Sequence, residues 1–275
     1  MKALVLSGGG YAGGAWMLGL IQELRDEGID LGAADLIVGT SAGARTGAQV
    51  ATGVLDEGVD LYRRSAMPEI AIPARLDQFV SATTRILLSS ADRRDAARRI
   101  ANLGPLGSEL VPETDRRNSI AAHLPVDAWP TQRLALCTVD ADTGDRVVFE
   151  RDSGVTLLDA VTASGALPGV FPLTRIDGRR YADGSVHSLY NADVAAGHDV
   201  VVVVSPLAMS DYLRSQLTAE TAALGDAAVR LVVADEASVA AIGPNPISAA
   251  TGAAAVAAGA AQAKRERGAL QAVWR

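Results

Sequence analysis

Short apolar runs and helical repeats alternate along the first sixty residues. Residues 2–6 form a mainly apolar run typical of a buried strand, and residues 14–27 repeat apolar side chains at helical spacing. A second apolar run at 35–38 precedes another helical stretch at 42–52. Strands and helices in this order predict an α/β fold, in which helical crossovers join the strands of a parallel sheet.

Strand patterns return in the second half of the chain. Five consecutive valines at 200–204 are typical of a strand buried on both faces of a parallel sheet. The other predicted elements are strands at 133–139, 146–150 and 230–233, a hairpin at 173–181, and a helix at 156–165. From about residue 235 to residue 275 the pattern is helical.

The pattern is interrupted between about residues 67 and 130. This stretch contains six prolines and a cluster of arginines, and it predicts short helices at 76–88 and 92–101. We expect an insertion that covers one edge or face of the sheet. The whole chain, 1–275, is then a single domain with a core at 3–205 and a helical C-terminal segment at 235–275.

The charge and the cysteine content restrict the possible partners and the cellular location of the protein. The net charge is −7, which disfavours nucleic acid as a partner, and any lipid contact must be apolar or rest on local arginines. Cys137 is the single cysteine, so no intrachain disulfide can form. No signal peptide or membrane span is recognisable, and we therefore predict a cytoplasmic location.

A glycine-rich turn follows the first strand. Gly8–Gly13 satisfies G-x-G-x-x-G, a pattern that binds dinucleotides when an acidic residue ends the second strand. Here Asp35 stands at the beginning of that strand, so the dinucleotide interpretation is disfavoured. A phosphate-binding loop is disfavoured as well, because no Gly-Lys-Ser/Thr follows the glycines.

The second strand runs into G-x-S-x-G, formed by Gly39, Thr40, Ser41, Ala42 and Gly43. A strand, a tight turn and a helix are the context in which such a serine becomes an exposed nucleophile. We therefore predict Ser41 as a nucleophile at a helix N-terminus.

The nucleophile prediction also suggests a role for the glycine-rich turn that follows the first strand. If it lies beside Ser41, the backbone N–H groups of Gly8, Gly9, Gly10 and Tyr11 can form the oxyanion hole of an acyl-transfer enzyme. We expect a side chain at Gly9 or Gly10 to impair this site more than it impairs stability.

A serine nucleophile needs a general base. Of the three histidines, His123 and His198 are expected to be surface or packing residues.

Four segments, taken in their order along the chain, resemble the motifs of the patatin-like phospholipase family. They are Ser7–Gly13, Gly39–Gly43, residues 163–172 (ASGALPGVFP) and Asp183-Gly184. The resemblance covers about residues 3–205.

The resemblance implies a three-layer α/β/α fold with a mostly parallel central sheet, helices on both faces, and a helical insertion that would form part of a lid or acyl channel. It implies a lipid acyl hydrolase of the phospholipase or esterase type, in which Ser41 is the nucleophile and Asp183 the general base. Gly184 and Ser185 would form the aspartate turn. The implied partner is a lipid or acyl-ester substrate, with transient contact to a membrane surface, and no cofactor or metal is expected.

Two positions depart from the family pattern. Ser185 replaces a glycine or alanine, and Ala12 stands where many members have arginine or lysine. Arg45, one helical turn after Ser41, could point towards the same site, although an ordinary salt bridge on its helix is the favoured interpretation.

Two other functions stay open. One is a Ser-Asp-His esterase that uses His187 as its base, and the other is a non-catalytic protein that binds acyl groups or lipids. In the insertion, Ile70, Ile72, Phe79, Ile86, Leu87 and Leu88 either contact the acyl chain or a membrane, or pack the insertion onto the sheet. The sequence makes no prediction of the oligomeric state.

Overall fold

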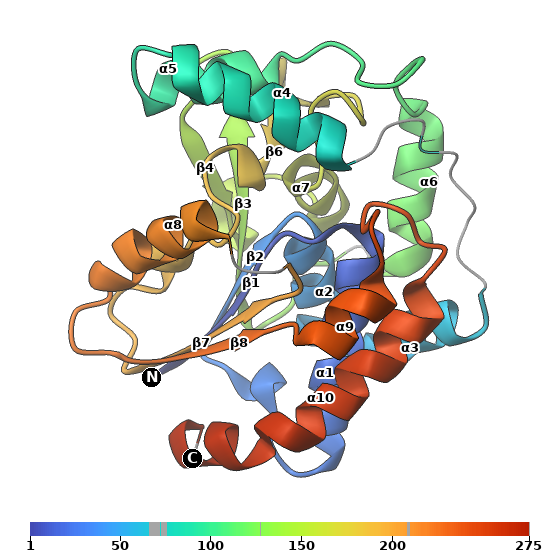
Figure 1. The fold of residues 1–275 in the computed structure, drawn as a ribbon, viewed down its shortest axis with the longest axis vertical. Helices are drawn as coiled ribbons and strands as arrows, with labels where there is room; N and C mark the ends of the chain where they lie inside the picture. The colour runs from blue at the N-terminus through green and yellow to red at the C-terminus, as the bar shows by residue number, and fades with distance from the viewer. Residues whose placement is uncertain (66–71, 73–75, 127, 208–209, 275) are drawn as a thin grey trace.

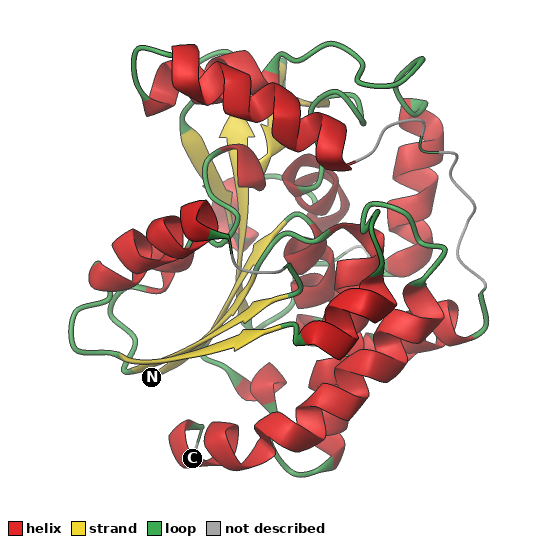
Figure 2. Cartoon of the chain, viewed as in Figure 1, coloured by secondary structure: helices red, strands yellow, loops and turns green. Residues whose placement is uncertain are grey.

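The computed structural model describes residues 1–275 except 66–71, 73–75, 127, 208–209 and 275 (Figure 1). The described residues form one eight-stranded sheet with helices on both faces (Figures 1 and 2). The strands are β1 (Lys2–Leu6), β2 (Leu36–Thr40), β3 (Arg133–Asp140), β4 (Arg146–Phe149), β5 (Thr174–Ile176), β6 (Arg179–Asp183), β7 (Val200–Ser205) and β8 (Ala228–Val233).

Ten α-helices accompany these strands in the described ranges. They are α1 (Gly10–Asp26), α2 (Ala42–Ala51), α3 (Leu55–Arg63), α4 (Leu76–Ser89), α5 (Arg93–Ala101), α6 (Glu113–His123), α7 (Leu157–Ser164), α8 (Asp211–Ala222), α9 (Glu236–Ile242) and α10 (Gly252–Val273). Short 3₁₀ turns occur at Leu31–Ala33, Arg151–Ser153, Gly184–Val186 and Ala192–Ala195.

The sheet is parallel at its centre and antiparallel at one side. Its order is β5-β6-β3-β2-β1-β7-β8, and β4 also pairs with β3. Strands β3, β2, β1, β7 and β8 are parallel neighbours, whereas β4, β5 and β6 pair antiparallel. The carboxyl ends of β1 and β2 therefore lie side by side.

Alternate side chains of each central strand face two different cores, as the period-two geometry of a strand requires. Leu4 and Leu6 of β1 face the core formed with α1, α2 and α10. Ala3 and Val5 face the opposite core, which α8 and the turn Ala192–Ala195 cover. Figure 1 shows α8 on one side of the sheet and α1, α2 and α10 on the other. The predicted three-layer α/β/α fold is confirmed.

Most of the elements that the sequence predicts agree with the structure to within one or two residues. The sequence pattern predicts no separate helix at α3, α6 or α8, and the helical segment expected at 235–275 is divided into α9 and α10. The first helix begins at Gly10, not at residue 14. Ala12 N–H donates to Pro246 O (3.0 Å) and Gly13 N–H to Gly9 O (3.1 Å). These contacts close the first turn of α1 within the glycine-rich stretch, so the loop between β1 and α1 is much shorter than expected.

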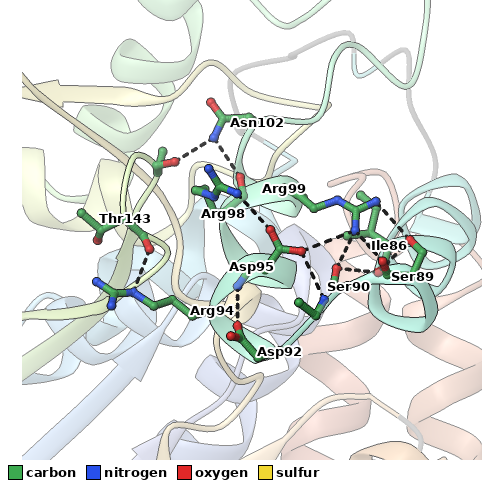
Figure 3. Close-up of polar contacts among 12 residues, drawn as sticks. Ile86, Ser89, Ser90, Asp92, Arg94, Asp95, Arg98, Arg99, Asn102 and Thr143 are labelled. Carbon is green, nitrogen blue, oxygen red and sulfur yellow. Dashed lines mark hydrogen bonds and ion pairs between the residues drawn. The ribbon is translucent and has the colours of Figure 1, made fainter.

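The predicted insertion contributes α4, α5 and α6. Figure 1 shows α4 and α5 across the end of the sheet towards which β3 points. Arg94 of α5 donates to Thr143 O in the β3–β4 turn (3.1 Å), and Arg99 donates to the Ser90 hydroxyl beyond the end of α4 (2.9 Å) (Figure 3). Helix α5 is thus bonded to the β3–β4 turn, and α4 is held by α5 and by Phe79, which packs against an apolar cluster that includes Phe171.

Helices α1 and α10 approach each other unusually closely. A Cβ placed on Gly259 of α10 would lie 2.1 Å from Trp16 O, and one on Gly19 of α1 would lie 2.1 Å from Val256 O. Only glycine permits this backbone contact, which packs α10 against the helix that carries the glycine turn.

Gly259→Ala should therefore destabilise the protein by about 1–3 kcal/mol, the usual cost of overpacking. Gly268→Ala is the matched control, because it lies in the same helix with open space around its Cβ position. That variant should gain up to about 1 kcal/mol from helix propensity. Urea titrations of both variants test the prediction, and equal stabilities would contradict it.

Candidate active site

The pairing of three strands brings Ser41 and Asp183 together. Thr40, the last residue of β2, is in register with Cys137 of β3. The next β3 residue, Thr138, is in register with Asp183 at the end of β6. Strand β6 runs antiparallel to β3 but overlaps only its last three residues, Thr138–Asp140, so Asp183 lies near the carboxyl end of β3 and close to Ser41.

Ser41 occupies a strained turn between β2 and α2. Its backbone has φ 56° and ψ −115°, a left-handed conformation that costs a non-glycine residue about 1–3 kcal/mol. Ser41 N–H donates to Ser164 Oγ (3.0 Å), and Ser164 Oγ donates to Cys137 O (2.6 Å). The buried Ser164 thus ties the strained residue to the neighbouring strand.

The two glycines of the motif are required by close backbone approach. Gly43 N–H donates to Ser7 O (3.1 Å), and a Cβ on Gly43 would lie 2.0 Å from Leu6 O. A Cβ on Gly39 would lie 2.6 Å from Ala44 Cα. The first turn of α2 therefore presses directly on the ends of β1 and β2.

The Asp183 carboxyl is completely buried. Burial raises its pKa above the ordinary value, against the opposing effects of the Ser41 hydroxyl, the Ser185 N–H and hydroxyl, and the charge of Arg116. Oδ1 accepts a hydrogen bond from Ser185 N–H (2.8 Å). Oδ2 has no well-formed hydrogen bond to any described residue, so its contact with the Ser41 hydroxyl is loose. Such contacts often tighten only when substrate binds.

Asn191 is a site residue that the sequence analysis missed. It is fully buried, has φ 52°, and donates from Nδ2 to Thr40 Oγ1 (3.0 Å) and Ser188 O (2.8 Å). It therefore links the strand before Ser41 to the loop after Asp183. An asparagine eight residues after an aspartate in a small polar run is too weak a signal to have indicated this role.

The glycine turn lies next to Ser41, as expected, but its N–H groups are not equivalent. A Cβ on Gly8 would lie 3.6 Å from Ser41 Cβ. Gly8 N–H is already bonded to Leu189 O (3.0 Å), so the expectation that it is free is corrected. Within the described ranges, the N–H groups of Gly9, Gly10 and Tyr11 have no protein acceptor. These three, at the N-terminus of α1, are the available donors.

Gly9 and Gly10 also have a packing role that the sequence did not reveal. A Cβ on Gly9 would lie 2.2 Å from Pro206 Cγ. Gly10 has φ 68°, and a Cβ there would lie 2.3 Å from Pro246 O. Larger residues at either position would disturb the fold. A substitution at either glycine therefore carries a cost in stability that the sequence-based expectation did not include.

The histidine rings lie away from the pair formed by Ser41 and Asp183. Within the described chain, the His187 ring has no hydrogen bond to either residue, and burial lowers its pKa to about 4. His123 is buried between the rings of Tyr11 and Tyr62, at centroid distances of 5.8 and 5.9 Å. His198 is buried before β7.

A cavity of about 540 Å³ opens above Ser41. Its wall is largely apolar and combines Phe79, Val80, Leu87 and Leu88 of α4 with Tyr212 and Leu213 of α8. Ile72 packs against the same apolar cluster as Phe79, whereas Ile70 lies outside the described residues. The insertion therefore contributes one wall of the cavity.

Two arginines line the inner part of this cavity, Arg45 of α2 and Arg116 of α6. In the described part of the chain, Arg45 forms no salt bridge and donates to the Tyr62 hydroxyl (3.1 Å). The favoured interpretation of Arg45 as an ordinary salt-bridging residue is therefore corrected.

The sequence profile of the patatin-like phospholipase family matches residues 4–196, which is most of the chain. The chain belongs to this family. It is 34% identical over 184 residues to uncharacterised NTE family proteins of Mycobacterium bovis and Mycobacterium tuberculosis. These alignments cover 67% of the chain and 42% of each relative, so the chain spans less than half the length of those relatives.

Two solved structures are similar to this patatin-like chain at lower sequence identity. VipD from Legionella pneumophila aligns with 80% of this chain and 53% of its own, at 18% identity and a TM-score of 0.41. The type III effector protein ExoU aligns with 96% of this chain and 53% of its own, at 16% identity and a TM-score of 0.38.

The described residues of this patatin-like chain contain no candidate metal centre. No group of three or more of their histidine, cysteine, aspartate or glutamate side chains is arranged to hold a metal ion. Among the described helices, none combines the length and apolar character that crossing a bilayer requires.

The buried carboxyl of Asp183 should reduce stability at neutral pH. Its pKa in the folded protein is above that in the unfolded chain, so the free energy of unfolding falls as the pH rises through the folded-state pKa. Asp183→Asn removes this charge and should raise the melting temperature at about pH 8, with a smaller gain at about pH 4.

Asp142→Asn is the control for this measurement, because Asp142 is exposed and its hydrogen bond to Arg180 lowers its pKa. It should show no gain at pH about 8. An Asp183→Asn protein that is less stable than the wild type at both pH values would contradict the assignment.

Proposed function

We propose that the chain is a serine acyl hydrolase that cleaves carboxylic esters of lipids, with Ser41 as nucleophile and Asp183 as general base. The observation that supports this most directly is the strained Ser41 turn beside a buried carboxyl of raised pKa. Family membership supports a lipid ester as the substrate class.

The first half of the reaction follows from these groups. Ser41 Oγ attacks the ester carbonyl carbon while its proton passes to the Asp183 carboxylate. The oxyanion that forms accepts hydrogen bonds from the free N–H groups of Gly9 and Gly10 at the N-terminus of α1. Collapse of this tetrahedral species breaks the bond to the alcohol, which leaves with the proton from Asp183.

Water completes the cycle. It attacks the acyl-Ser41 ester and gives a proton to Asp183. The second oxyanion then collapses and releases the carboxylic acid, while Asp183 returns the proton to Ser41 Oγ and both groups regain their starting state. A base is most effective when its pKa lies near the working pH, so desolvation that raises the pKa of Asp183 makes it a better proton acceptor. Ser164 and Asn191 keep the two residues in place.

A histidine relay has weaker support. Burial holds the His187 pKa at about 4, and its ring lines a separate small pocket with Arg93 and Arg146. A purely binding function would leave the strain at Ser41 and the buried carboxyl without a purpose. The same set of variants distinguishes the proposed mechanism from both alternatives.

Ser41→Ala and Asp183→Asn should each lower kcat for a p-nitrophenyl ester by about 10³-fold or more, as loss of a nucleophile or its base does in other serine hydrolases. His187→Ala is the matched control and should retain most activity. In a pH–activity profile, the activity should fall at acid pH as Asp183 becomes protonated, and the profile of His187→Ala should show the same fall. A large loss in folded His187→Ala, or turnover by Ser41→Ala, would overturn this mechanism.

The outer rim of the cavity suits contact with a lipid surface. Val80, Leu88 and Tyr212 are 52%, 84% and 56% exposed, and together they make an apolar border around the opening. We therefore place the membrane contact at α4 and α8, with α4 as the element that covers the opening.

Leu88→Glu should lower turnover of a vesicle-borne ester relative to that of a soluble short-chain ester, because a carboxylate opposes insertion at the rim. Val239→Glu is the control, since Val239 is also exposed but lies on α9 outside the cavity wall. The ratio of the two rates, measured for both variants, tests the contact. An unchanged ratio in Leu88→Glu would contradict it.

A further inference from the structure

The inner wall of the cavity contains two buried positive charges. Arg45 comes from α2 and Arg116 from α6, and they are only 4% and 5% exposed. Both line the same cavity as Ser41. Arg45 follows Ser41 by one helical turn, a rise of about 6 Å along α2.

Neither guanidinium has a carboxylate at salt-bridge distance among the described residues. Arg116 donates to Gly165 O (2.6 Å) and to the Tyr11 hydroxyl (3.2 Å), and Arg45 donates to the Tyr62 hydroxyl (3.1 Å). The Nε atoms of both arginines have no partner there. Each guanidinium carries five N–H donors, so most of the donors are unused. The charge of Asp183 acts on Arg116 from beyond salt-bridge distance, but it is one negative charge against two buried positive ones, a strongly unfavourable balance.

The two guanidiniums meet at Tyr11. The Arg45 guanidinium carbon lies 4.6 Å from the centroid of the Tyr11 ring, while Arg116 bonds to the hydroxyl of the same residue. Burial raises the Tyr11 pKa, but the charges of Arg116 and Arg45 outweigh it and the pKa lies below its usual value. His123 contributes no charge of its own, because burial and the charge of Arg45 lower its pKa to about 3 and the ring stays neutral near pH 7.

This part of the cavity therefore has a net positive charge, unused donors and an opening towards Ser41. We propose that Arg45 and Arg116 bind an anionic group of the substrate, a carboxylate or a phosphate, that lies a few bonds from the ester attacked by Ser41. Planar guanidiniums match the oxygens of both groups, often with two parallel hydrogen bonds. The inference rests on the proposed esterase function and adds a specificity to it.

Two matched pairs of esters test the subsite and separate its two possible ligands. Mono-p-nitrophenyl adipate and p-nitrophenyl hexanoate differ by a carboxylate on the acyl side. Lysophosphatidic acid and the monoacylglycerol of the same acyl chain differ by a phosphate on the alcohol side. In at least one pair, kcat/KM of the wild type should favour the anionic ester by about tenfold or more, the effect of a charge-assisted hydrogen bond.

Substitutions then assign that preference to the arginines. Arg45→Met and Arg116→Met should each reduce the anionic-to-neutral ratio about tenfold, whatever happens to the neutral rate. Arg45→Lys should retain part of the ratio, since lysine keeps the positive charge but not the paired N–H donors of the planar guanidinium. Arg117→Met is the control, because Arg117 is exposed and paired with Asp159 (2.5 Å), and it should leave the ratio unchanged.

Several results would overturn the subsite. These are a ratio near one in both wild-type pairs, a ratio that survives in both methionine variants, or equal losses on the anionic and neutral esters. Failure of the esterase proposal is seen separately, as absence of turnover of p-nitrophenyl hexanoate by the wild type.

A binding measurement tests the anion subsite if turnover is absent or the methionine variants do not fold. Calorimetric titration of the Ser41→Ala protein with octyl phosphate, octanoate and 1-octanol compares head groups on one apolar chain. At least one of the two anions should bind about tenfold or more tightly than the alcohol. Equal affinities for all three compounds would contradict an anion subsite.

Discussion

The close approach of α2 to the end of β1 is the contact on which the rest of the site depends. Gly43 N–H donates to Ser7 O (3.1 Å), and no Cβ could be accommodated at that position. This contact forces the chain to turn within a single residue, so Ser41 adopts its left-handed conformation. The same contact places the beginning of α1, with its free N–H groups, beside the serine. Ser164 and Asn191 then hold the strained turn against the neighbouring strand and loop.

The site also contains buried ionisable side chains. The fully buried Asp183 has a raised pKa, and two buried guanidiniums lie in the same cavity. Each of these groups would be more favourably placed in water, so the fold accepts a loss of stability where the chemistry is expected. The charge of Arg116 partly offsets the desolvation of Asp183. In the proposed mechanism, the carboxyl accepts protons and the arginines select the substrate.

The strands and the pairing of Ser41 with Asp183 could be predicted from the sequence, because they depend on short apolar runs and on family motifs at strand ends. The start of α1 at Gly10 could not, since the N–H of Ala12 in its first turn finds its acceptor on Pro246, which is distant in the sequence. Arg45 was misjudged for a similar reason: its partner Tyr62 comes from another helix. Arg116 carried no signal at all, as it lies in an arginine cluster whose other members are mostly exposed.

Labelling with a fluorophosphonate tests the central claim most directly, because the probe reacts with an activated serine whatever the natural substrate is. Peptide mass spectrometry should find a single adduct, on Ser41. The labelling rate should fall about 10²–10⁴-fold in Asp183→Asn, the contribution of a general base, and stay near the wild-type rate in His187→Ala. An adduct on another residue, or equal labelling rates in the wild type and Asp183→Asn, would contradict the account.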